Sequence, residues 1–418
     1  MDDAPTRPLI PTASAPGSLH GLRVLELSTS VAGPGTGQIL GDLGAEVLKV
    51  ERVGAGDDTR AWAPPAWDGV STAFLGLNRN KKSIELNYRD PRGKRILEQL
   101  IERSDVLVQN LRPGALAKAG FSWERLQELN HRLIYCEITG FGPVGPRAGD
   151  AAYDPLLQAF TGMTNLMPVT EHGPTRVPMS IIDKGTAHWA VIGIFEALRR
   201  RDATGKGSQV GVSLLQTALE WLGGSVMAAR AGLPPSKNLG SGHPGVVPYG
   251  AFPTSDGWVF VAAGNQPMWE TLIRALGAPE LNDIEGFGTN QGRSARREEV
   301  TVALSEVTRR FSVKKITDAL AAAGVPHSPI RSAHDLAADP QVQALGAISD
   351  LPHPQVGNFA VVNLPVVVDG AHLPHQSPPP LLGADSAATL RELLGLTDEQ
   401  VRELADARVT GAGAADGG

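Results

Sequence analysis

Residues 21–50 read GLRVLELSTSVAGPGTGQILGDLGAEVLKV and contain two short apolar runs separated by a glycine-rich segment. Short apolar runs bounded by turn-forming residues predict strands, here at Leu22–Leu27 and Glu46–Val50. Between them we expect a loop over Ser28–Gly37 and a helix over Gln38–Leu43. The order of strand, helix and strand predicts a βαβ unit, in which a crossover helix joins two parallel strands.

The same alternation of strands and helices continues along the first half of the chain. Further strands are expected at Asp105–Gln109 and Leu133–Ile138, and helices at Pro91–Arg103, Trp123–Asn130 and Gly185–Arg201. Alternating strands and helices predict an α/β fold with a parallel sheet that is covered on both faces.

The pattern changes after a long helical stretch at Ser213–Ala231. Residues 233–248 are rich in Pro, Gly and Ser and are typical of a linker, and Tyr249–Ala262 predicts a hairpin that turns at Asp256-Gly257. Beyond it we expect four helices, the third of them capped by Ser312: Gln266–Leu276, Arg296–Phe311, Val313–Ala323 and Ser386–Leu396.

These patterns divide the chain into domains and tails. Residues 1–19 and 409–418 are expected to be flexible tails. Residues 20–230, completed by 331–408, would form a large domain, and residues 231–330 a smaller one.

Composition excludes several classes of protein. The chain has 418 residues, of which 42% are hydrophobic and 20% are charged, as in globular proteins. Its net charge of -6 gives no overall positive field for nucleic acid or an anionic membrane. The single cysteine, Cys136, cannot form an internal disulfide, which fits a reducing, cytoplasmic setting. The most apolar run, Ala187–Leu198, is shorter than the ~20 residues that span a bilayer, so no membrane span is expected.

The glycine-rich segment Ala32–Gly37 allows two interpretations. Backbone N–H groups of such a turn, placed between a strand and a helix, can approach a phosphate. The dinucleotide fingerprint G-x-G-x-x-G is not met, however, because Gln38 stands where the third glycine is required. Glu51 could hold a ribose hydroxyl or pair with Arg52 at the surface. The alternative is a tight βα connection with no ligand.

Basic residues are frequent in the same predicted domain. Several follow expected strands, at the sheet edge where open α/β folds bind ligands, and a phosphorylated ligand needs such cations. The alternative is a solvated surface. The residues in question are Arg52, Arg60, Lys81, Lys82, Arg89, Arg112 and Lys118.

Two acids precede expected helices. Asp183 stands just before Gly185, where backbone donors and the helix dipole would hold a carboxylate ionised and able to act as a nucleophile. The alternative is an ordinary N-cap. Asp154 either belongs to the same site or simply opens a helix at Pro155–Phe160.

A flexible segment and several missing motifs complete the survey. Gly240–Gly245 could close over a site as a lid, or serve as a linker. No P-loop and no G-x-S-x-G nucleophile motif occurs. The histidines are scattered, and His372 and His375 are not spaced along one helix face, so no metal site is expected.

Many ordered motifs resemble the class III CoA-transferases, the family that includes formyl-CoA transferase, carnitine CoA-transferase and α-methylacyl-CoA racemase. The likeness extends over most of residues 20–385. Its motifs are GLRVLEL at 21–27, AGP at 32–34, LGAEVLKVE at 43–51, GDDTR at 56–60, NKKSI at 80–84, DVLVQN at 105–110, RPG at 112–114, TGFGP at 139–143, ALR at 197–199, TGKGSQ at 204–209, GVP at 324–326 and DP at 339–340.

The resemblance implies roles for individual residues. Asp183 falls on the family's catalytic aspartate, and Gly240, Ser241 and Gly242 resemble the glycine-rich loop over the substrate. Lys118 and Leu111 replace the arginine and phenylalanine that are common there, and a lysine lacks the fork of an arginine. The implied CoA contacts are Val31, Ala32, Arg52, Leu86, Arg89, Asn110, Leu111, Lys118, Tyr153 and Asp154.

The resemblance also implies a reaction: CoA moves from an acyl-CoA donor to a carboxylic acid through mixed anhydrides and an aspartyl-CoA thioester on Asp183. CoA esters are then substrates, and no tightly bound cofactor, metal, nucleic acid or membrane is implied. A dicarboxylate or hydroxy acid is expected as acceptor because the family often uses such acids. Arg176, His172 and His243 either meet this acid or lie at the surface.

Three other functions are weighed against this one. In the racemase branch a histidine precedes the residue equivalent to Asp154, whereas this chain has Tyr153, and tyrosine, with an ordinary pKa near ~10, is a poor base at neutral pH. A protein that binds CoA esters without turnover is the second alternative. A nicotinamide oxidoreductase, suggested only by the βαβ opening, is the third. The architecture implied is a Rossmann-like large domain with an inserted, smaller α+β domain, in an interlocked homodimer.

Overall fold

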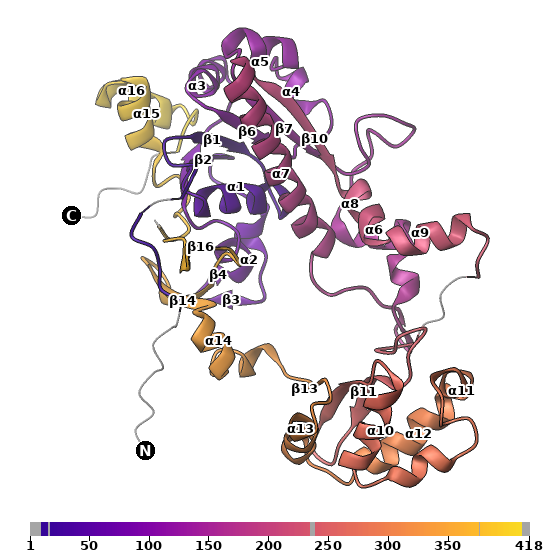
Figure 1. The fold of residues 1–418 in the computed structure, drawn as a ribbon. Helices are drawn as coiled ribbons and strands as arrows, with labels where there is room; N and C mark the ends of the chain where they lie inside the picture. Colours follow the sequence, from indigo (N-terminus) through magenta and orange to yellow (C-terminus); the bar gives the residue numbers. More distant parts are fainter. Residues whose placement is uncertain (1–9, 16, 235–238, 376, 412–418) are drawn as a thin grey trace, which may run out of the picture. The chain divides into compact units, whose positions relative to one another are not determined.

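The computed structural model describes residues 10–15, 17–234, 239–375 and 377–411, which form two compact units. The first unit comprises Met1–Met163, Arg176–Gly223 and Asp339–Gly418, and the second comprises Thr164–Thr175 and Gly224–Ala338 (Figure 1). The domain limits expected from the sequence and the interlocked homodimer stay predictions. No helix among the described residues is long and apolar enough to cross a membrane.

A six-stranded, all-parallel sheet forms the centre of the first unit. This confirms the predicted α/β fold. The strand order is that of a doubly wound sheet, in which the chain first builds outward from β1 on one side and then returns to build the other side from β6. In spatial order the strands are β10 (Ser208–Ser213), β7 (Ile134–Thr139), β6 (Val106–Gln109), β1 (Arg23–Leu27), β2 (Glu46–Glu51) and β5 (Lys81–Glu85).

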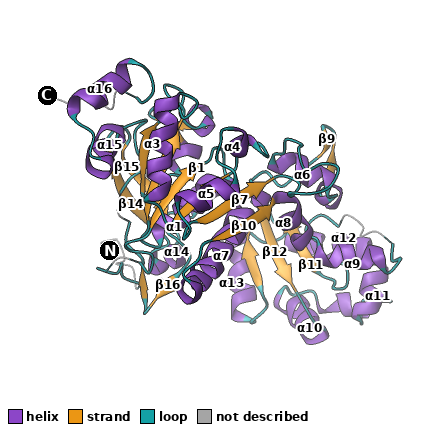
Figure 2. Cartoon of the chain, turned by 90° about the horizontal axis from the view of Figure 1, so that it is seen from above, coloured by secondary structure: helices purple, strands orange, loops and turns teal. Residues whose placement is uncertain are grey.

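Helices cover both faces of this sheet, because each face is apolar. On one face α1 (Ala32–Asp42) and α7 (Ile181–Thr204) lie against each other and against the sheet, with Leu40 and Ile194 fully buried. The opposite face carries a second core of buried residues. Its helices, seen from above in Figure 2, are α3 (Pro91–Glu102), α5 (Trp123–Leu129), α15 (Ser386–Leu394) and α16 (Asp398–Asp406).

The expected loop Ser28–Gly37 is wrong in its second half, because α1 already begins at Ala32. The glycines of this segment do not form a turn; they allow α1 to pack closely against β1 and the residues that follow it. A Cβ at Gly33 would lie 2.3 Å from the Ser28 Cβ, and one at Gly37 would lie 1.9 Å from Glu26 Oε2. The helix therefore approaches the sheet more closely than side chains at these positions would allow.

Two further boundaries differ from the expectation. The predicted helix Ser213–Ala231 is wrong at its start and is interrupted, because Ser213 ends strand β10 and caps α8 (Leu214–Trp221), which α9 (Gly223–Arg230) follows. Strand β10 was not expected, although Val210 and Val212 alternate with polar residues as strand residues do. Helix α16 was also missed; Thr397 and Gln400 form a capping box at its start.

The second unit confirms the predicted hairpin and its helices. Strands β11 (Tyr249–Pro253) and β12 (Trp258–Ala262) pair antiparallel, and β13 (His327–Pro329) adds a third strand. Ser312 caps α13 as expected, accepting a hydrogen bond from Lys315 N at 3.3 Å. The helices are α10 (Gln266–Ala275), α11 (Asn290–Ala295), α12 (Arg297–Thr308) and α13 (Val313–Ala322), around a core that includes the fully buried Trp269.

The described residues of the two expected tails are attached to the first unit. Thr12 bridges to His372, and Leu19 is buried. Val409 and Thr410 are also buried. The remaining helices and strands are short: β3 (Ala66–Trp67), β4 (Val70–Ser71), α2 (Thr72–Leu75), α4 (Ala115–Lys118), α6 (Asp154–Phe160), β8 (Val169–Thr170), β9 (Gly173–Pro174), α14 (Pro340–Leu345), β14 (Ile348–His353), β15 (Gly357–Val362), β16 (Val367–Val368) and β17 (Ala371–His372).

Candidate active site

A pocket of about 720 Å³ opens at the carboxyl ends of β1, β6 and β7. The strand order reverses between β1 and β6, and open α/β sheets bind ligands at such a switch point. We call it the Asp183 pocket, because the first turn of α7 contributes Asp183 to its wall. The other walls come from residues 29–32 after β1, residues 110–113 after β6, residues 138–140 at the end of β7 and residues 150–155 at the start of α6.

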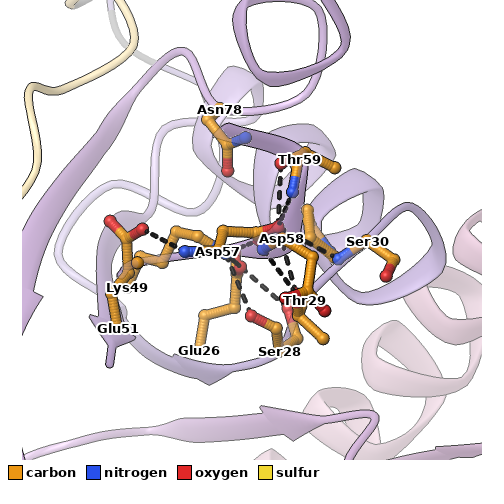
Figure 3. A network of polar contacts seen from close by, with 12 residues as sticks. Glu26, Ser28, Thr29, Ser30, Lys49, Glu51, Asp57, Asp58, Thr59 and Asn78 are labelled. Carbon is orange, nitrogen blue, oxygen red and sulfur yellow. Dashed lines mark hydrogen bonds and ion pairs between the residues drawn. The ribbon is translucent and has the colours of Figure 1, made fainter. Parts of the chain in front are cut away.

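The segment after β1 is held from two sides. The Asn110 side chain accepts a hydrogen bond from Thr29 N at 2.9 Å and donates one to Thr29 O at 2.7 Å. Asp57 Oδ1 accepts from Thr29 Oγ1 at 3.1 Å and from Ser30 N at 3.2 Å (Figure 3). Ser30 has a φ of 69°, a left-handed conformation that needs such support in a non-glycine residue. These contacts fix the backbone that leads to Val31 and Ala32.

Asp57 belongs to a fully buried network of charges. Lys49 Nζ lies 2.7 Å from Asp57 Oδ2 and 2.8 Å from Glu26 Oε1, as the close view shows (Figure 3). Lys81 Nζ lies 2.9 Å from Glu26 Oε2 and donates to Pro34 O of α1 at 2.7 Å. Although burial opposes ionisation, Lys49 and the donors of Thr59 lower the pKa of Asp57 to about 2. The network therefore connects the core of the sheet to the wall of the pocket.

Asp154 holds the start of α7. Its Oδ2 accepts hydrogen bonds from Ile182 N at 2.6 Å and from Asp183 N at 3.1 Å, and its Oδ1 accepts from Gln158 Nε2 at 2.6 Å. Asp154 is buried, and the N-cap residue of α7 is Ser180. The interpretation of Asp183 as an ordinary N-cap is therefore wrong, and Asp154 does more than open α6.

The carboxyl group of Asp183 is not held in its ionised form. Burial, together with the nearby Asp154 carboxylate, raises the pKa of Asp183 to about 7. The expectation that the helix start keeps this group ionised is wrong, because Asp154 already accepts from the N–H groups of Ile182 and Asp183. Near neutral pH the group is thus present in both protonation states.

A second pocket, of about 950 Å³, adjoins the first and shares Arg52 and Leu111 with it. We call it the arginine pocket, because Arg52, Arg89 and Arg408 all line it. Glu85 contributes the carboxylate of its lining. The rest of the wall is formed by Val53, Gly54, Leu86, Asn87, Tyr88, Ala405, Thr410 and Gly411.

Most of the site residues expected from the sequence line these two pockets. Asp183, Val31, Ala32, Arg52, Asn110, Leu111, Tyr153 and Asp154 line the Asp183 pocket, and Leu86 and Arg89 line the arginine pocket with Arg52 and Leu111. Lys118, in α4, lines neither of them. Gly240, Ser241 and Gly242 belong to the second unit, where Ser241 Oγ accepts from Ala251 N at 2.8 Å. Their roles stay predictions.

Several of the basic residues have partners within the protein. Arg60 donates to both carboxylate oxygens of Glu51, at 2.8 and 2.7 Å. Glu51 therefore pairs with Arg60 and not with Arg52, and its oxygens are already used as acceptors within the protein. Arg52 pairs with Asp58. Lys81 belongs to the buried network, and Lys82 pairs with Glu46 at 2.8 Å. Arg112, in contrast, lines the Asp183 pocket.

Sequence reasoning missed other residues of the site. Asp57 was quoted only as part of a motif, and its contacts with Thr29 and Ser30 depend on a loop that no local pattern describes. Arg408 was assigned only to the large domain and Thr410 to the tail, and neither was assigned to a site. Arg176, for which the sequence left open a contact with the acidic substrate or a place at the surface, is exposed and also lines the Asp183 pocket.

The structure offers no alternative centre of metal or thiol chemistry among the residues it describes. No group of three or more His, Cys, Asp or Glu side chains in the described ranges could hold a metal ion. Cys136 is fully buried in β7, and burial, with the nearby Glu137, raises the pKa of its thiol to about 12.

This sheet, with an acid at its switch point, defines an α/β protein that belongs to CoA-transferase family III, whose model matches residues 19–386. The chain is a class III CoA-transferase. It is 37% identical to the succinyl-CoA:glutarate CoA-transferase of Homo sapiens over 94% of this chain and 89% of that protein. It is 33% identical to the formyl-CoA:oxalate CoA-transferase of Streptomyces avermitilis over 93% and 98%. The crystal structure of a CAIB/BAIF family protein from Brucella suis superposes with a TM-score of 0.83 at 36% identity, covering 91% of this chain and 100% of that one.

Proposed function

We propose that this enzyme moves CoA from an acyl-CoA donor to a dicarboxylic acid, with Asp183 as the nucleophile. The observation that carries the proposal is the position of Asp183 in a pocket that adjoins a second pocket lined by three arginines. CoA is an extended molecule with phosphates at one end and a thioester at the other. The arginine pocket fits the phosphates, and the Asp183 pocket fits the thioester.

The reaction proceeds by exchange of acyl groups on Asp183. The Asp183 carboxylate attacks the donor thioester carbonyl and expels CoA thiolate, which leaves a mixed anhydride. The thiolate attacks the aspartyl carbonyl of this anhydride, which releases the donor acid and forms aspartyl-CoA. The acceptor carboxylate then attacks the aspartyl-CoA carbonyl, and the returning thiolate attacks the acceptor acyl carbonyl, which frees Asp183 and the new acyl-CoA. Each step exchanges one leaving group for another, and no proton or electron is gained or lost.

The surroundings of Asp183 favour its acylation. Burial and the charge of Asp154 disfavour the Asp183 anion, as its pKa of about 7 indicates. Acylation removes this negative charge, so it relieves the repulsion that the free carboxylate experiences. The ionised fraction is correspondingly more basic and more nucleophilic than an ordinary aspartate. Backbone N–H groups of the pocket walls would stabilise the tetrahedral oxyanions.

The expected CoA contacts agree with this orientation. Leu86 and Arg89 would bind the phosphorylated end, and Arg52 and Leu111, which line both pockets, would meet the middle of the molecule. Val31, Ala32, Asn110 and Tyr153 would surround the thioester end, and Asp154 would keep its positioning role. Lys118 is left out of the proposal, since it lines neither pocket. Gly240, Ser241 and Gly242 belong to the second unit and are left out of the proposal.

A dicarboxylic acid fits the charges of the Asp183 pocket. Arg112 and Arg176 line it, and neither forms an ion pair within the described part of the chain. A second carboxylate on the acceptor would provide the missing partner. The names of both relatives, which specify glutarate and oxalate, agree with such an acid.

The racemase alternative lacks the histidine that would act together with Asp183. Proton transfer beside the thioester carbonyl needs a second acid or base in the pocket. No histidine lines the Asp183 pocket within the described residues, and the exposed Tyr153 stands where the racemase branch has one. The structure thus offers no observation that favours the racemase.

Purified enzyme tests the proposal when it is incubated with acyl-CoA donors and a series of mono- and dicarboxylic acids, with new CoA esters measured by mass spectrometry. We expect transfer to dicarboxylates, and loss of transfer in Asp183→Ala. Asp150→Asn is the matched control, because Asp150 lines the same pocket but pairs with Arg147 at 2.7 Å. Transfer in Asp183→Ala equal to wild type would overturn the role of Asp183. Deuterium exchange beside the carbonyl of a 2-methylacyl-CoA without transfer would favour the racemase.

A further inference from the structure

The end of the chain forms one wall of the arginine pocket. Ala405 at the end of α16, Arg408, Thr410 and Gly411 line it beside residues 85–89, at and after the end of β5. Ala405 lies in the last described helix, and the other three residues follow it. No site role was expected for any of them from the sequence.

Backbone contacts hold this segment in place. Asn87 N donates to Val409 O at 2.8 Å, and Leu86 pairs with Thr410 as an antiparallel bridge. Val409 N donates back to Leu404 O of α16 at 2.9 Å. These bonds fix the turn at Arg408, whose φ of 54° lies in the left-handed region. The segment is therefore an ordered part of the pocket wall.

Gly411 lets this wall approach closely. A Cβ at Gly411 would lie 1.7 Å from Glu85 Oε2, and one at Gly383 would lie 2.3 Å from the same atom. The other oxygen, Glu85 Oε1, accepts a hydrogen bond from Gly54 N at 2.5 Å. The Glu85 carboxylate is thus enclosed by backbone on several sides. Among the described residues, it forms no ion pair with the arginines of the pocket.

Two features of the wall lack a partner. Arg89 and Arg408 form no ion pair among the described residues, whereas Arg52 pairs with Asp58. Thr410 is only 1% exposed, and its Oγ1 has no hydrogen-bond partner. A buried hydroxyl without a partner is costly and usually indicates a ligand or a water. Two guanidinium groups and a hydroxyl are the donors that a phosphate group accepts from.

We propose that Arg408 and Thr410 bind a phosphate group of the acyl-CoA substrate, so that the C-terminal segment is part of the substrate site. This inference rests on the proposed function, and it adds ligand-binding residues from the end of the chain. Arg408 supplies charge-assisted hydrogen bonds and Thr410 supplies one hydroxyl donor. Both line the arginine pocket and neither lines the Asp183 pocket, so they affect binding of the donor and not the chemistry at its carbonyl.

Arg408→Gln and Arg408→Lys test the charge of this residue. Because charge-assisted hydrogen bonds to phosphate are strong, we expect KM for the acyl-CoA donor to rise roughly tenfold in Arg408→Gln, with kcat and the KM of the acid unchanged. The lysine variant should recover part of the loss. Arg402→Gln is the matched control, since exposed Arg402 lies on α16, which precedes Arg408, bonds to Asp398 O and lines neither pocket. An unchanged KM in Arg408→Gln overturns the inference.

Truncated donors locate the phosphate. With a pantetheine thioester, which has no nucleotide, wild type and Arg408→Gln should have equal KM values. If the difference already disappears with a dephospho-CoA ester, Arg408 binds the 3′-phosphate. If it persists there and disappears only with pantetheine, Arg408 binds the diphosphate. A difference of the same size with all three donors contradicts phosphate binding.

Thr410→Val tests the hydroxyl without measuring activity. The variant removes an unpartnered polar atom and keeps the side-chain shape, so the free protein should unfold at the same temperature as wild type or higher. Its Kd for CoA, measured by calorimetry, should rise several-fold. A lower unfolding temperature with unchanged Kd would assign Thr410 a purely structural role. Wild-type enzyme that neither transfers nor binds CoA overturns the proposed function as well, whereas normal wild-type transfer with unaffected variants overturns this inference alone.

Discussion

At the scale of single residues, the account depends on two neighbouring acids with different tasks. Asp154 is buried, and it accepts from two N–H groups at the start of α7 and so positions that helix. These N–H groups donate to Asp154 and not to the Asp183 carboxyl group. Burial and the nearby Asp154 raise the pKa of Asp183 to about 7. The proposed nucleophile thus lies beside an acid that positions the start of its helix.

Asp154→Asn tests this electrostatic coupling. The amide oxygen can still accept from Ile182 N and Asp183 N, but the negative charge is removed. The pKa of Asp183 should therefore fall toward its ordinary value. Since the attacking group is the carboxylate, the rise of kcat/KM for the donor with pH should move to lower pH. A pH profile identical to that of wild type would contradict the coupling.

Asp183→Asn should abolish transfer and stabilise the fold at alkaline pH. The pKa of Asp183 is raised to about 7 in the folded chain, above the ~4 of an unfolded aspartate. Its stabilising contribution is therefore present below about pH 4 and is lost as the pH rises through about 7. Asparagine does not ionise, so the variant should unfold at a higher temperature than wild type at pH 8, and by a smaller margin at pH 5. An equal difference at both pH values would contradict the raised pKa.

At the scale of elements, the buried network couples the sheet to the pocket wall. Strands β1, β2 and β5 contribute Glu26, Lys49 and Lys81, and the loop after β2 contributes Asp57, which holds Thr29 and Ser30. A buried pair stabilises a fold weakly compared with apolar packing, but removing one partner leaves a buried charge uncompensated. The network therefore gives the loop after β1 a single position.

Asp57→Ala should break this connection. It leaves Lys49 with one carboxylate fewer and the donors of Thr29 and Ser30 unpaired, so the free energy of unfolding should fall by about 3–5 kcal/mol. Asp57→Asn keeps the acceptor at Oδ1 and should lose less. The exposed pair between Lys314 and Asp318 provides the control: Asp318→Asn should leave urea unfolding unchanged. Equal losses in Asp57→Ala and Asp318→Asn would show that the network contributes nothing specific.

The close packing of α1 against the sheet leads to a second prediction, on the effect of adding a Cβ at its glycines. A Cβ at Gly37 would lie 1.9 Å from Glu26 Oε2, so Gly37→Ala should destabilise the protein by about 1–3 kcal/mol. Gly224, in α9, has no atom within 4 Å of such a Cβ, so Gly224→Ala should stabilise by about 0.5–1 kcal/mol through helix propensity. Urea unfolding measures both, and a stabilised Gly37→Ala would contradict the close approach.

At the scale of the whole molecule, the sequence predicts the sheet better than it predicts the site. Four of the six parallel strands follow from short apolar runs alternating with helices, as in Leu22–Leu27 and Glu46–Val50, whereas β5 and β10 were not expected. The glycines of α1 were misread because glycine usually marks a turn, whereas Gly33 and Gly37 are needed for contact with Ser28 and Glu26, which no local pattern shows.

The site depends on contacts between distant parts of the chain. Asp154 accepts a hydrogen bond from Ile182 N at the start of α7, which lies far from it in the sequence. Arg408 lines the pocket because Thr410 pairs with Leu86. The role of Asp183 was expected from a family resemblance, but its raised pKa arises from burial and from Asp154, which only the fold brings together. Composition at the end of the chain indicated a tail, although Val409 and Thr410 are buried.

The most direct test of the account is to trap the acyl group on Asp183. Wild-type enzyme is mixed with an acyl-CoA donor, quenched and digested, and the peptide that contains Asp183 is examined by mass spectrometry. We predict a CoA adduct on Asp183 that disappears when a dicarboxylic acid is added, and no adduct in Asp183→Asn. Transfer that proceeds without any adduct, and that persists in Asp183→Asn, would contradict Asp183 as the nucleophile.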